Sequence, residues 1–266
     1  MSKVTLAIPN TGRVHSLMIE PIVLISNDSR HEVRLDLFHG VPIEASRNEI
    51  VLRFLESGGD YLLFIDDDNP PINNPLDLIE EDPDVMIYPT PTWGHNLDRN
   101  ICVMPIKWNV YELSQPCRSG EEPTDSTTYY ESAVWDKEGS FEIECGGSGC
   151  MLIARRVLEK VRKPFMRRFD DDGLCVQGSD FVFCQKAKKA GFKIWTNFGY
   201  WCRHLKERDL AEMFVMYANA MRLGNERRVE GTLGSGDRAG HYAPLGESRS
   251  AGEEDGEISQ ATGGAQ

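Results

Sequence analysis

The sequence has 266 residues, with 29 lysines and arginines against 42 aspartates and glutamates, which gives a formal net charge of −13 at pH 7. Hydrophobic residues make up 40% of the chain and charged residues 27%, a composition that is ordinary for a globular protein and excludes wholesale disorder. The acidic balance argues against a protein that coats nucleic acid by charge alone, because phosphate contacts need a basic face.

Neither a membrane span nor a cysteine framework is indicated. No apolar run approaches the roughly 20 residues that cross a bilayer. The N-terminal apolar run, residues 4–8, is too short for a signal peptide, so we expect a cytoplasmic protein. The 7 cysteines contain no C-x-x-C pair, so reduced and mostly buried thiols are expected rather than zinc ligands or disulfides.

Strand and helix signals alternate over the first 90 residues. Short apolar or alternating runs predict strands, and apolar residues at helical spacing predict helices. We expect strands at 4–8, 33–38, 61–65 and 85–88, and helices at 14–25, 43–55 and 76–81. This repetition predicts an α/β fold with a mainly parallel sheet and helices on both faces, whose ligands bind at the carboxyl ends of the strands.

The second half is less regular and ends in a stretch of different composition. From Thr90 to about Glu144 the pattern loosens into short strands and long loops, and Asp170 to Gly173 indicates a hairpin turn. The Gly-, Ser- and Glu-rich residues 224–266 are typical of a flexible tail. Further strands are expected at 141–145, 151–153, 192–195 and 200–204, and helices at 155–161, 179–190 and 205–223.

Three carboxylates, Asp66, Asp67 and Asp68, directly follow the most hydrophobic predicted strand. Adjacent carboxylates repel one another, and a hard divalent cation such as Mg²⁺ or Mn²⁺ would compensate them. If the extended chain continues, Asp66 and Asp68 share a direction while Asp67 points away. A solvated acidic loop is the alternative, but the position at the carboxyl edge of the sheet favours a metal site.

Several ordered motifs resemble the nucleotide-sugar-dependent glycosyltransferases of the GT-A fold. They are a Pro-containing first turn after residue 8, the helix start Ala45-Ser46-Arg47-Asn48, the 61–68 strand with its DxD motif, the segments 146–153 and 178–184, and His204 after the last strand. The chain is most similar to compact family-2-like enzymes often encoded by bacteriophages, which would place it in the host cytoplasm. The likeness covers approximately Lys3 to His204 and implies a GT-A domain at 1–223, with a nucleotide-binding half at 1–90 and an acceptor and catalytic half at 91–223.

The resemblance also implies roles for individual residues. Asp68 and His204 would hold Mn²⁺ or Mg²⁺, with Asp66 contributing to the metal site or contacting the ribose. Arg47 would lie near the phosphates or the acidic triplet, and the loop residues Pro9, Asn10, Thr11 and Arg13 would hold the nucleoside. Gly147, within the run Gly146 to Gly149, would let the backbone approach the sugar or acceptor. A UDP-sugar is the donor favoured by the likeness.

Asp180 is the implied general base of an inverting displacement. A carboxylate within hydrogen-bond reach can take the proton that an acceptor hydroxyl loses during attack. Many relatives carry Glu-Asp where this chain has Ser179-Asp180, and we favour Asp180 as the base with Ser179 as a helix cap. The alternative is that Asp180 only complements the dipole of its helix, as acidic residues in first turns commonly do.

A local basic stretch suggests an acceptor that carries phosphate, such as DNA with modified bases, a lipid phosphate or a phosphorylated glycan. A solvated helix face explains the same pattern equally well. The stretch consists of Arg155, Arg156, Lys160, Arg162, Lys163, Arg167 and Arg168.

Three functions remain open from the sequence. The leading hypothesis is a metal-dependent glycosyltransferase that moves a sugar from a nucleotide diphosphate sugar to an acceptor hydroxyl. A nucleotidyltransferase also uses carboxylates and metal on an α/β sheet, although residues 9–13 match its usual glycine-rich phosphate loop poorly. The third hypothesis is a non-catalytic protein that binds a nucleotide sugar.

Overall fold

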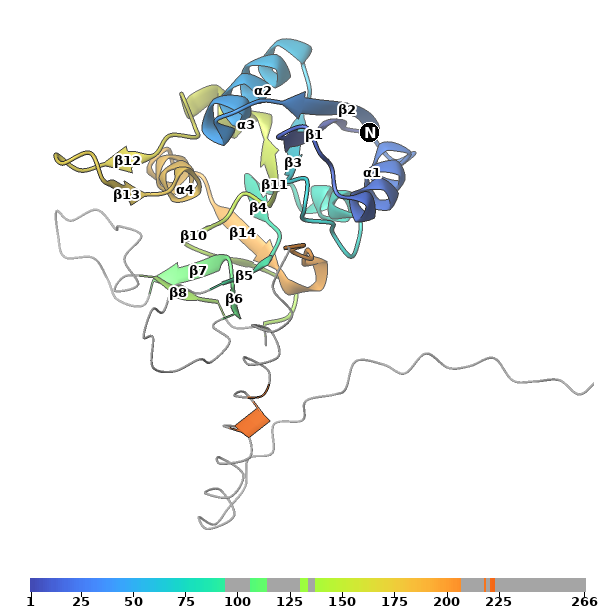
Figure 1. Ribbon diagram of the computed structural model, residues 1–266. Coiled ribbons are helices and arrows are strands. Elements are labelled where there is room, and N and C mark those ends of the chain that lie inside the picture. The colour runs from blue at the N-terminus through green and yellow to red at the C-terminus, as the bar shows by residue number, and fades with distance from the viewer. Residues whose placement is uncertain (94–105, 114–129, 134–136, 207–217, 219–220, 223–266) are drawn as a thin grey trace, which may run out of the picture. The chain divides into compact units, whose positions relative to one another are not determined.

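The computed structural model describes residues 1–93, 106–113, 130–133, 137–206, 218 and 221–222 (Figure 1). Its centre is a sheet of seven strands. They are β1 (Lys3–Asn10), β2 (Glu32–His39), β3 (Tyr61–Ile65), β4 (Val85–Ile87), β9 (Ser140–Glu142), β11 (Cys150–Ala154) and β14 (Ile194–Asn197). The order across the sheet is β2-β1-β3-β11-β4-β14-β9. All strands run in one direction except β11 and β9, so the sheet is mixed and mainly parallel, as predicted.

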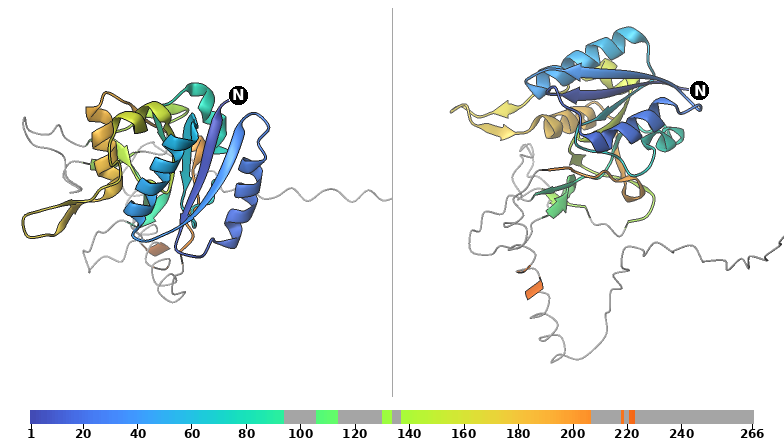
Figure 2. Two further views of the ribbon diagram at one scale, coloured as in Figure 1. Left: turned by 90° about the horizontal axis from the view of Figure 1, so that it is seen from above. Right: turned by 45° about the vertical axis from the view of Figure 1, so that its right-hand side comes forward.

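Helices cover both faces of this sheet. The connections from β1 to β2 and from β2 to β3 cross the sheet in opposite directions, and right-handed crossovers therefore put their helices on opposite faces. Figure 2 shows α1 on one side of the sheet and α2, α3 and α4 on the other. The helices are η1 (Ser16–Met18), α1 (Ile19–Ser26), α2 (Ile43–Ser57), η2 (Pro75–Glu81), α3 (Arg155–Lys160), α4 (Ser179–Lys189) and η3 (Phe198–Tyr200).

Smaller sheets flank the central one. A three-stranded sheet has the order β10-β7-β8, and two hairpin-like pairs join β5 to β6 and β12 to β13. The turn at Asp170–Gly173 closes the β12–β13 pair through a hydrogen bond of 3.0 Å from the Gly173 N–H to the Asp170 carbonyl, which confirms the predicted hairpin. These strands are β5 (Pro91–Trp93), β6 (Ile106–Trp108), β7 (Val110–Leu113), β8 (Tyr130–Ser132), β10 (Cys145–Gly146), β12 (Arg168–Phe169) and β13 (Cys175–Gln177).

The core is centred on β3 and β11. Every residue of these two neighbouring strands is buried, as expected for strands covered on both faces. On the α2 side, the ring of Phe165 meets Phe64 of β3 edge-on at 5.5 Å and stacks on Phe183 of α4 at 5.1 Å. This cluster holds the end of β3, and therefore the acidic triplet, in a fixed position.

Several expected elements differ in the structure. The residues expected to form one strand at 141–145 belong to β9 and β10 in two different sheets, and the helix expected at 76–81 is the 3₁₀ helix η2. The helix expected at 14–25 begins with the 3₁₀ turn η1, whose Leu17 N–H donates to the His15 ring at 3.1 Å, and only then becomes α1. The strand expected at 200–204 is not a regular strand, since only Cys202 makes an isolated bridge, to Pro71. The reason lies in the facing segment, because Pro70 and Pro71 lack the N–H groups that a continuous ladder needs.

The chain divides into two units, Met1–Ala220 and Met221–Gln266. Most of the second unit, including the tail predicted at 224–266, lies outside the described residues, and so does most of the helix predicted at 205–223. Among the described residues, no helix has the length and hydrophobicity that crossing a membrane requires. Four described cysteines are buried free thiols, as predicted, and Cys175 is exposed, whereas Cys102 and Cys117 lie outside the described residues.

Candidate active site

The candidate active site lies where the carboxyl ends of β3 and β4 meet the start of β11. Because β11 is antiparallel to both of its neighbours, the glycine-rich loop that precedes β11 lies at the same edge of the sheet as the carboxyl ends of β3 and β4. Hydrogen bonds join the three strands at this edge, from the Asp66 N–H to the Gly149 carbonyl at 2.8 Å and from the Tyr88 N–H to the Cys150 carbonyl at 3.0 Å. The acidic triplet and the glycine-rich loop are therefore direct neighbours.

A pocket of about 260 Å³ opens at this edge, and most of its lining is polar. Four residues singled out in the sequence, Asp66, Gly147, Asp180 and His204, line it together. Its other lining residues are Asn69, Thr90, Thr92, Asn109, Tyr111, Ser148, Gly149 and Phe181. The pocket thus offers hydroxyl, amide and carboxylate groups beside the aromatic rings of Tyr111 and Phe181, which lie 5.2 Å apart.

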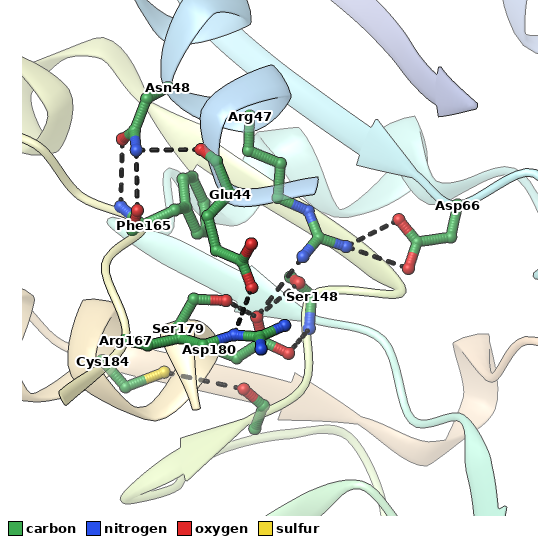
Figure 3. Close-up of polar contacts among 11 residues, drawn as sticks. Glu44, Arg47, Asn48, Asp66, Ser148, Phe165, Arg167, Ser179, Asp180 and Cys184 are labelled. Carbon is green, nitrogen blue, oxygen red and sulfur yellow. Dashed lines mark hydrogen bonds and ion pairs between the residues drawn. The ribbon is translucent and has the colours of Figure 1, made fainter. Parts of the chain in front are cut away.

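Arg47 in the second turn of α2 connects two carboxylates of the site (Figure 3). Its Nη2 donates to both oxygens of Asp66, at 2.7 and 2.9 Å, and its Nη1 lies 3.5 Å from Asp180 Oδ1. The guanidinium is buried, and its Nε has no partner among the described residues. Burial alone would lower the pKa of Arg47, but Asp66 and Asp180 raise it above the usual value. Burial raises the pKa of Asp66, and Arg47 opposes that shift.

Asp180 is held by hydrogen-bond donors from two chain segments (Figure 3). Its Oδ1 accepts from the Ser148 hydroxyl at 2.8 Å and from the Ser179 hydroxyl at 3.2 Å, and its Oδ2 accepts from the Ser148 N–H at 3.1 Å. Ser179 was expected to cap α4, but its hydroxyl donates to the side chain of Asp180, and Gly178 occupies the N-cap position. The carboxylate is thus oriented by the glycine-rich loop, with Oδ2 carrying the fewer bonds.

Asp68 and His204 are neighbours because two chain segments run alongside each other in opposite directions. The Leu205 N–H donates to the Asp68 carbonyl at 2.9 Å, and the Arg203 N–H donates to the Pro70 carbonyl, also at 2.9 Å. This pairing puts His204 Nε2 3.8 Å from Asp68 Oδ2, and the Lys206 ammonium contacts the same oxygen. The acidic triplet itself turns rather than continuing extended, with the Asn69 N–H bonded to the Asp66 carbonyl at 3.1 Å.

That turn corrects the expected alternation of the triplet. Because the extended conformation ends at Ile65, Asp66 and Asp68 do not share one partner: Asp66 contacts Arg47 and Asp68 contacts His204 and Lys206. Asp67 lies beside the first loop: burial, Asp68 and Asp66 raise the pKa of its carboxyl group, and the backbone of Thr11 opposes that shift. The Asp67 carbonyl accepts from the His15 N–H at 3.0 Å.

The donor groups of Asp68 and His204 suit a divalent cation. His204 Nδ1 lies 2.8 Å from the Pro91 carbonyl, which can only accept, so Nδ1 carries a proton and Nε2, on the Asp68 side, is the ring nitrogen that could ligate a metal. The Lys206 ammonium shows that a cation is compatible with Asp68. Among the described residues, no group of three or more His, Cys, Asp or Glu side chains is arranged to hold a metal. A cation here would therefore have two protein ligands and take the others from substrate phosphates or water.

The first loop is close to the triplet but does not line the pocket. Asn10 is buried and uses its side chain within the fold, donating to the Phe38 carbonyl at 3.1 Å and accepting from the Gly12 N–H at 2.9 Å. Pro9 is buried near the end of strand β1, whereas Thr11 and Arg13 are exposed. The exposed Thr11 and Arg13, rather than the Asn10 side chain, are thus the loop residues that a ligand could reach.

Glycine is required at the start of β11 because two asparagine side chains come close to the backbone. A Cβ at Gly147 would lie 2.6 Å from Asn109 Nδ2, and one at Gly149 would lie 3.1 Å from Asn69 Oδ1. Asn109 is itself fixed, since its Oδ1 accepts from the Thr90 N–H at 2.8 Å. The glycines therefore bring these amides to the wall of the pocket.

Sequence reasoning missed several residues of the pocket. Ser148, which gives Asp180 two of its hydrogen bonds, could have been found as the only polar side chain in the glycine-rich run. Asn69 follows the triplet directly and was overlooked in favour of the three carboxylates. Asn109 and Tyr111 come from the irregular region after residue 90, where no pattern in the sequence singles them out.

The basic stretch does not form one surface. Arg155 donates to the Leu55 and Gly59 carbonyls, and Arg156 pairs with Asp82 and Asp84, so both serve the fold. Arg167 pairs with Glu44 at 2.6 Å. The later members of the stretch line a separate groove on the α2 side of the molecule, namely Arg162, Lys163, Arg167 and Arg168.

Comparisons with known proteins give structural likenesses at low identity. No family model matches the chain, and no curated protein matches it by sequence. The crystal structure of A197 from STIV aligns with a TM-score of 0.49 at 20% identity, over 77% of this chain and 86% of that one.

Two further solved structures are similar. GalNAc-T7 with UDP, GalNAc and Mn²⁺ aligns with a TM-score of 0.42 at 11% identity, over 78% of this chain and 44% of that one. CMP:2-keto-3-deoxy-manno-octonic acid synthetase complexed with CTP aligns with a TM-score of 0.36 at 10% identity, over 84% of this chain and all of that one. At these scores the likenesses assign no activity, and the function has to be argued from the site.

Proposed function

We propose that the protein is a metal-dependent glycosyltransferase that moves a sugar from a nucleotide diphosphate sugar to an acceptor hydroxyl. The observation that carries the proposal is the oriented carboxylate of Asp180 in the same pocket as Asp66 and His204, with Asp68 next to His204. Such a reaction needs a base for the hydroxyl proton and positive charge for the leaving diphosphate, and this edge of the sheet supplies groups for both.

Asp180 is the proposed general base. Ser148 and Ser179 fix the position of its carboxylate, and three donors contact Oδ1 whereas only the Ser148 N–H contacts Oδ2. Oδ2 therefore keeps more of its capacity to accept a proton from an acceptor hydroxyl that enters the pocket. Attack from the side of Asp180, opposite the leaving diphosphate, would invert the configuration of the transferred sugar.

Asp68 and His204 are the proposed ligands of Mn²⁺ or Mg²⁺. When bound, the ion would neutralise charge on the diphosphate of the donor. Arg47 orients Asp66 through two hydrogen bonds. The Asp66 carboxylate can then accept a hydrogen bond from a hydroxyl group of the nucleotide sugar. The amides of Asn69 and Asn109 and the hydroxyls of Thr90 and Thr92 give the pocket the hydrogen-bonding capacity that a sugar requires.

The test is a panel of nucleotide sugars, beginning with UDP-sugars, with and without Mn²⁺. A ligand that binds only the native state raises the melting temperature, so the donor should stand out as a Mn²⁺-dependent shift. Slow hydrolysis of that donor should release a nucleoside diphosphate and a free sugar. Pyrophosphate release from a nucleoside triphosphate plus a sugar would instead identify a nucleotidyltransferase and refute the proposal.

Two variants and a matched control separate binding from chemistry. Asp180→Asn should keep the Mn²⁺-dependent shift and lose turnover by about 10²–10⁴-fold, the usual contribution of a general base. Asp68→Asn should lose the Mn²⁺-dependent part of the shift. Asp171→Asn, an exposed carboxylate in the β12–β13 turn, should change neither. Full turnover in Asp180→Asn would refute its role as base, and a shift without any turnover would indicate a binding protein.

A further inference from the structure

A second, larger hollow lies on the other side of α2 from the candidate active site. It is a groove of about 730 Å³ between α2, α3, α4 and the segment 161–168, and we call it the α2–α4 groove. Its volume lies within the roughly 300–1,000 Å³ of typical small-molecule sites. Apolar side chains form its walls, namely Val51, Leu52, Leu55, Leu158 and Val182. Leu52 is 57% exposed, so part of this wall is open to solvent.

Three cations line the groove without an acidic partner. Arg162, Lys163 and Lys186 form no ion pair with any described residue, in a chain whose net charge is −13. Other basic residues nearby are compensated, such as Arg167 by Glu44. Burial and the neighbouring Lys163 lower the pKa of Lys186, which means that the positive charges are crowded together. An anion placed among them would relieve this repulsion.

The position of Lys163 is held against its backbone preference. Its φ of +47° is in the left-handed region, which is unfavourable for a residue other than glycine. Lys186 stabilises this turn by donating from Nζ to the Lys163 carbonyl at 2.8 Å. Lys163 and Lys186 are thus two of the three cations that have no acidic partner among the described residues. The strained backbone of Lys163 places its charge next to that of Lys186 at the end of the apolar groove.

We propose that the α2–α4 groove binds an anionic amphiphile, with an alkyl chain against Leu52, Leu55 and Val182 and a phosphate or carboxylate head group at Arg162, Lys163 and Lys186. The inference stands on the groove alone and does not depend on sugar transfer. A half-open groove of this volume is in the range of small-molecule sites and fits one alkyl chain better than the broad apolar face of a peptide helix. Insertion of the nearby β12–β13 hairpin into an anionic membrane is disfavoured, because its tip carries Asp170, Asp171 and Asp172.

The test is binding of dodecyl phosphate, below its micelle concentration, to the full chain by calorimetry. Dodecyl maltoside has the same alkyl chain without the charge, and inorganic phosphate has the charge without the chain. Dodecyl phosphate should bind clearly more tightly than either. Equal binding of dodecyl maltoside would overturn the role of the cations, and equal binding of inorganic phosphate would overturn the role of the apolar wall.

Variants separate the site from general effects on folding. Lys163→Gly removes one cation and the backbone strain together, so it should melt at or above the temperature of the parent while binding dodecyl phosphate about tenfold more weakly. Leu52→Gln should also weaken binding, because Leu52 forms the wall and is already exposed. Lys160→Gln, which removes a charge at the end of α3 outside the groove, should bind like the parent. Unchanged binding in Lys163→Gly would refute the proposal.

Two further arms identify the source of the amphiphile. Vesicles with and without phosphatidic acid report whether a membrane lipid reaches the groove. The proposal is supported if the protein binds the vesicles or the free amphiphile and Lys163→Gly abolishes that binding. An acidic amphipathic peptide that binds in a Lys163-dependent way, while dodecyl phosphate does not bind, would overturn the proposal in favour of a protein partner.

Discussion

Arg47 is a buried guanidinium that lies between two carboxylates. Its contacts with Asp66 and Asp180 link α2 to the end of β3 and the start of α4, and the Phe165 ring lies 5.8 Å from its charged group. Removing one partner from such a buried network leaves the others without compensation. Arg47 thus determines how both carboxylates of the site are oriented.

The first prediction concerns this network. Arg47→Met should lower the free energy of unfolding by about 2–4 kcal/mol, since it leaves two partly buried carboxylates unpaired. Arg47→Lys should lower the free energy of unfolding by a smaller amount, because lysine keeps the positive charge although it cannot reproduce the bidentate hydrogen bonds. Urea unfolding at pH 7 measures both. Adding Asp66→Asn to Arg47→Met should recover part of the loss, and strictly additive effects would contradict the coupling.

A second prediction at a single residue concerns Lys206, whose ammonium contacts Asp68. If Asp68 and His204 hold a divalent ion, Lys206→Met should tighten Mn²⁺ binding by about threefold to tenfold, because a competing positive charge is removed from a solvent-accessible site. Free Mn²⁺ can be measured by electron paramagnetic resonance. Lys160→Met removes an equal charge elsewhere and should have no effect, whereas weaker binding in Lys206→Met would contradict the assignment.

Between elements, the end of α1 is joined to η2 by a small ionic network. Arg30 pairs with Asp28 and with Asp77, both at 2.6 Å, and the Asn74 amide donates to Asp28 at 2.7 Å. The hydrogen bond from Arg30 lowers the pKa of Asp28 well below its usual value, against the effect of burial. The side chain of Asp28 is 6% exposed whereas that of Arg30 is 49% exposed, so the contact is only partly shielded from solvent.

This network gives a pH-dependent prediction. A carboxylate whose pKa is lowered by folding adds stability above its unfolded pKa of about 3.9, and this stability is lost as the pH falls toward the folded value. Asp28→Asn should therefore cost about 1–2 kcal/mol at pH 7, allowing for the exposure of Arg30. The difference from the parent should shrink below about pH 4. Urea unfolding at both pH values measures it, and a constant difference would contradict the ion pair.

The elements were easier to predict from the sequence than the site. Periodicity located β3 and α2 because each buries a continuous run or a regular face, and the position of Asp66–Asp68 followed from the end of β3. The strand expected at 200–204 failed because prolines on another segment interrupt its pairing. Asn109 and Tyr111 reach the pocket through contacts distant in sequence, which no local pattern encodes.

At the scale of the whole molecule, the net charge of −13 repels an anionic nucleotide sugar. Long-range repulsion should slow the association of a nucleotide sugar at low ionic strength. Raising the salt from about 0.01 M to 0.15 M shortens the screening length from about 30 to 8 Å, so association should become faster. Stopped-flow measurements on the donor found by thermal shift test this, with a neutral sugar as control. Slower association at higher salt would show that a local positive field dominates instead.

The reversed direction of β11 has a consequence for how this architecture can vary. Tyr88, after β4, and Cys150, at the start of β11, are joined by a hydrogen bond, so the stretch between them, which includes the edge strand β9, begins and ends at adjacent points. Such a segment can be exchanged for one of different length without altering the span that its ends must bridge. Its residues Asn109 and Tyr111 form one wall of the pocket, while Asp66 and Asp68 belong to the unaltered scaffold. Grafting that segment from a homologue should therefore change selectivity while Asp66 and Asp68 stay in place, provided that Ser148, which orients Asp180, is kept.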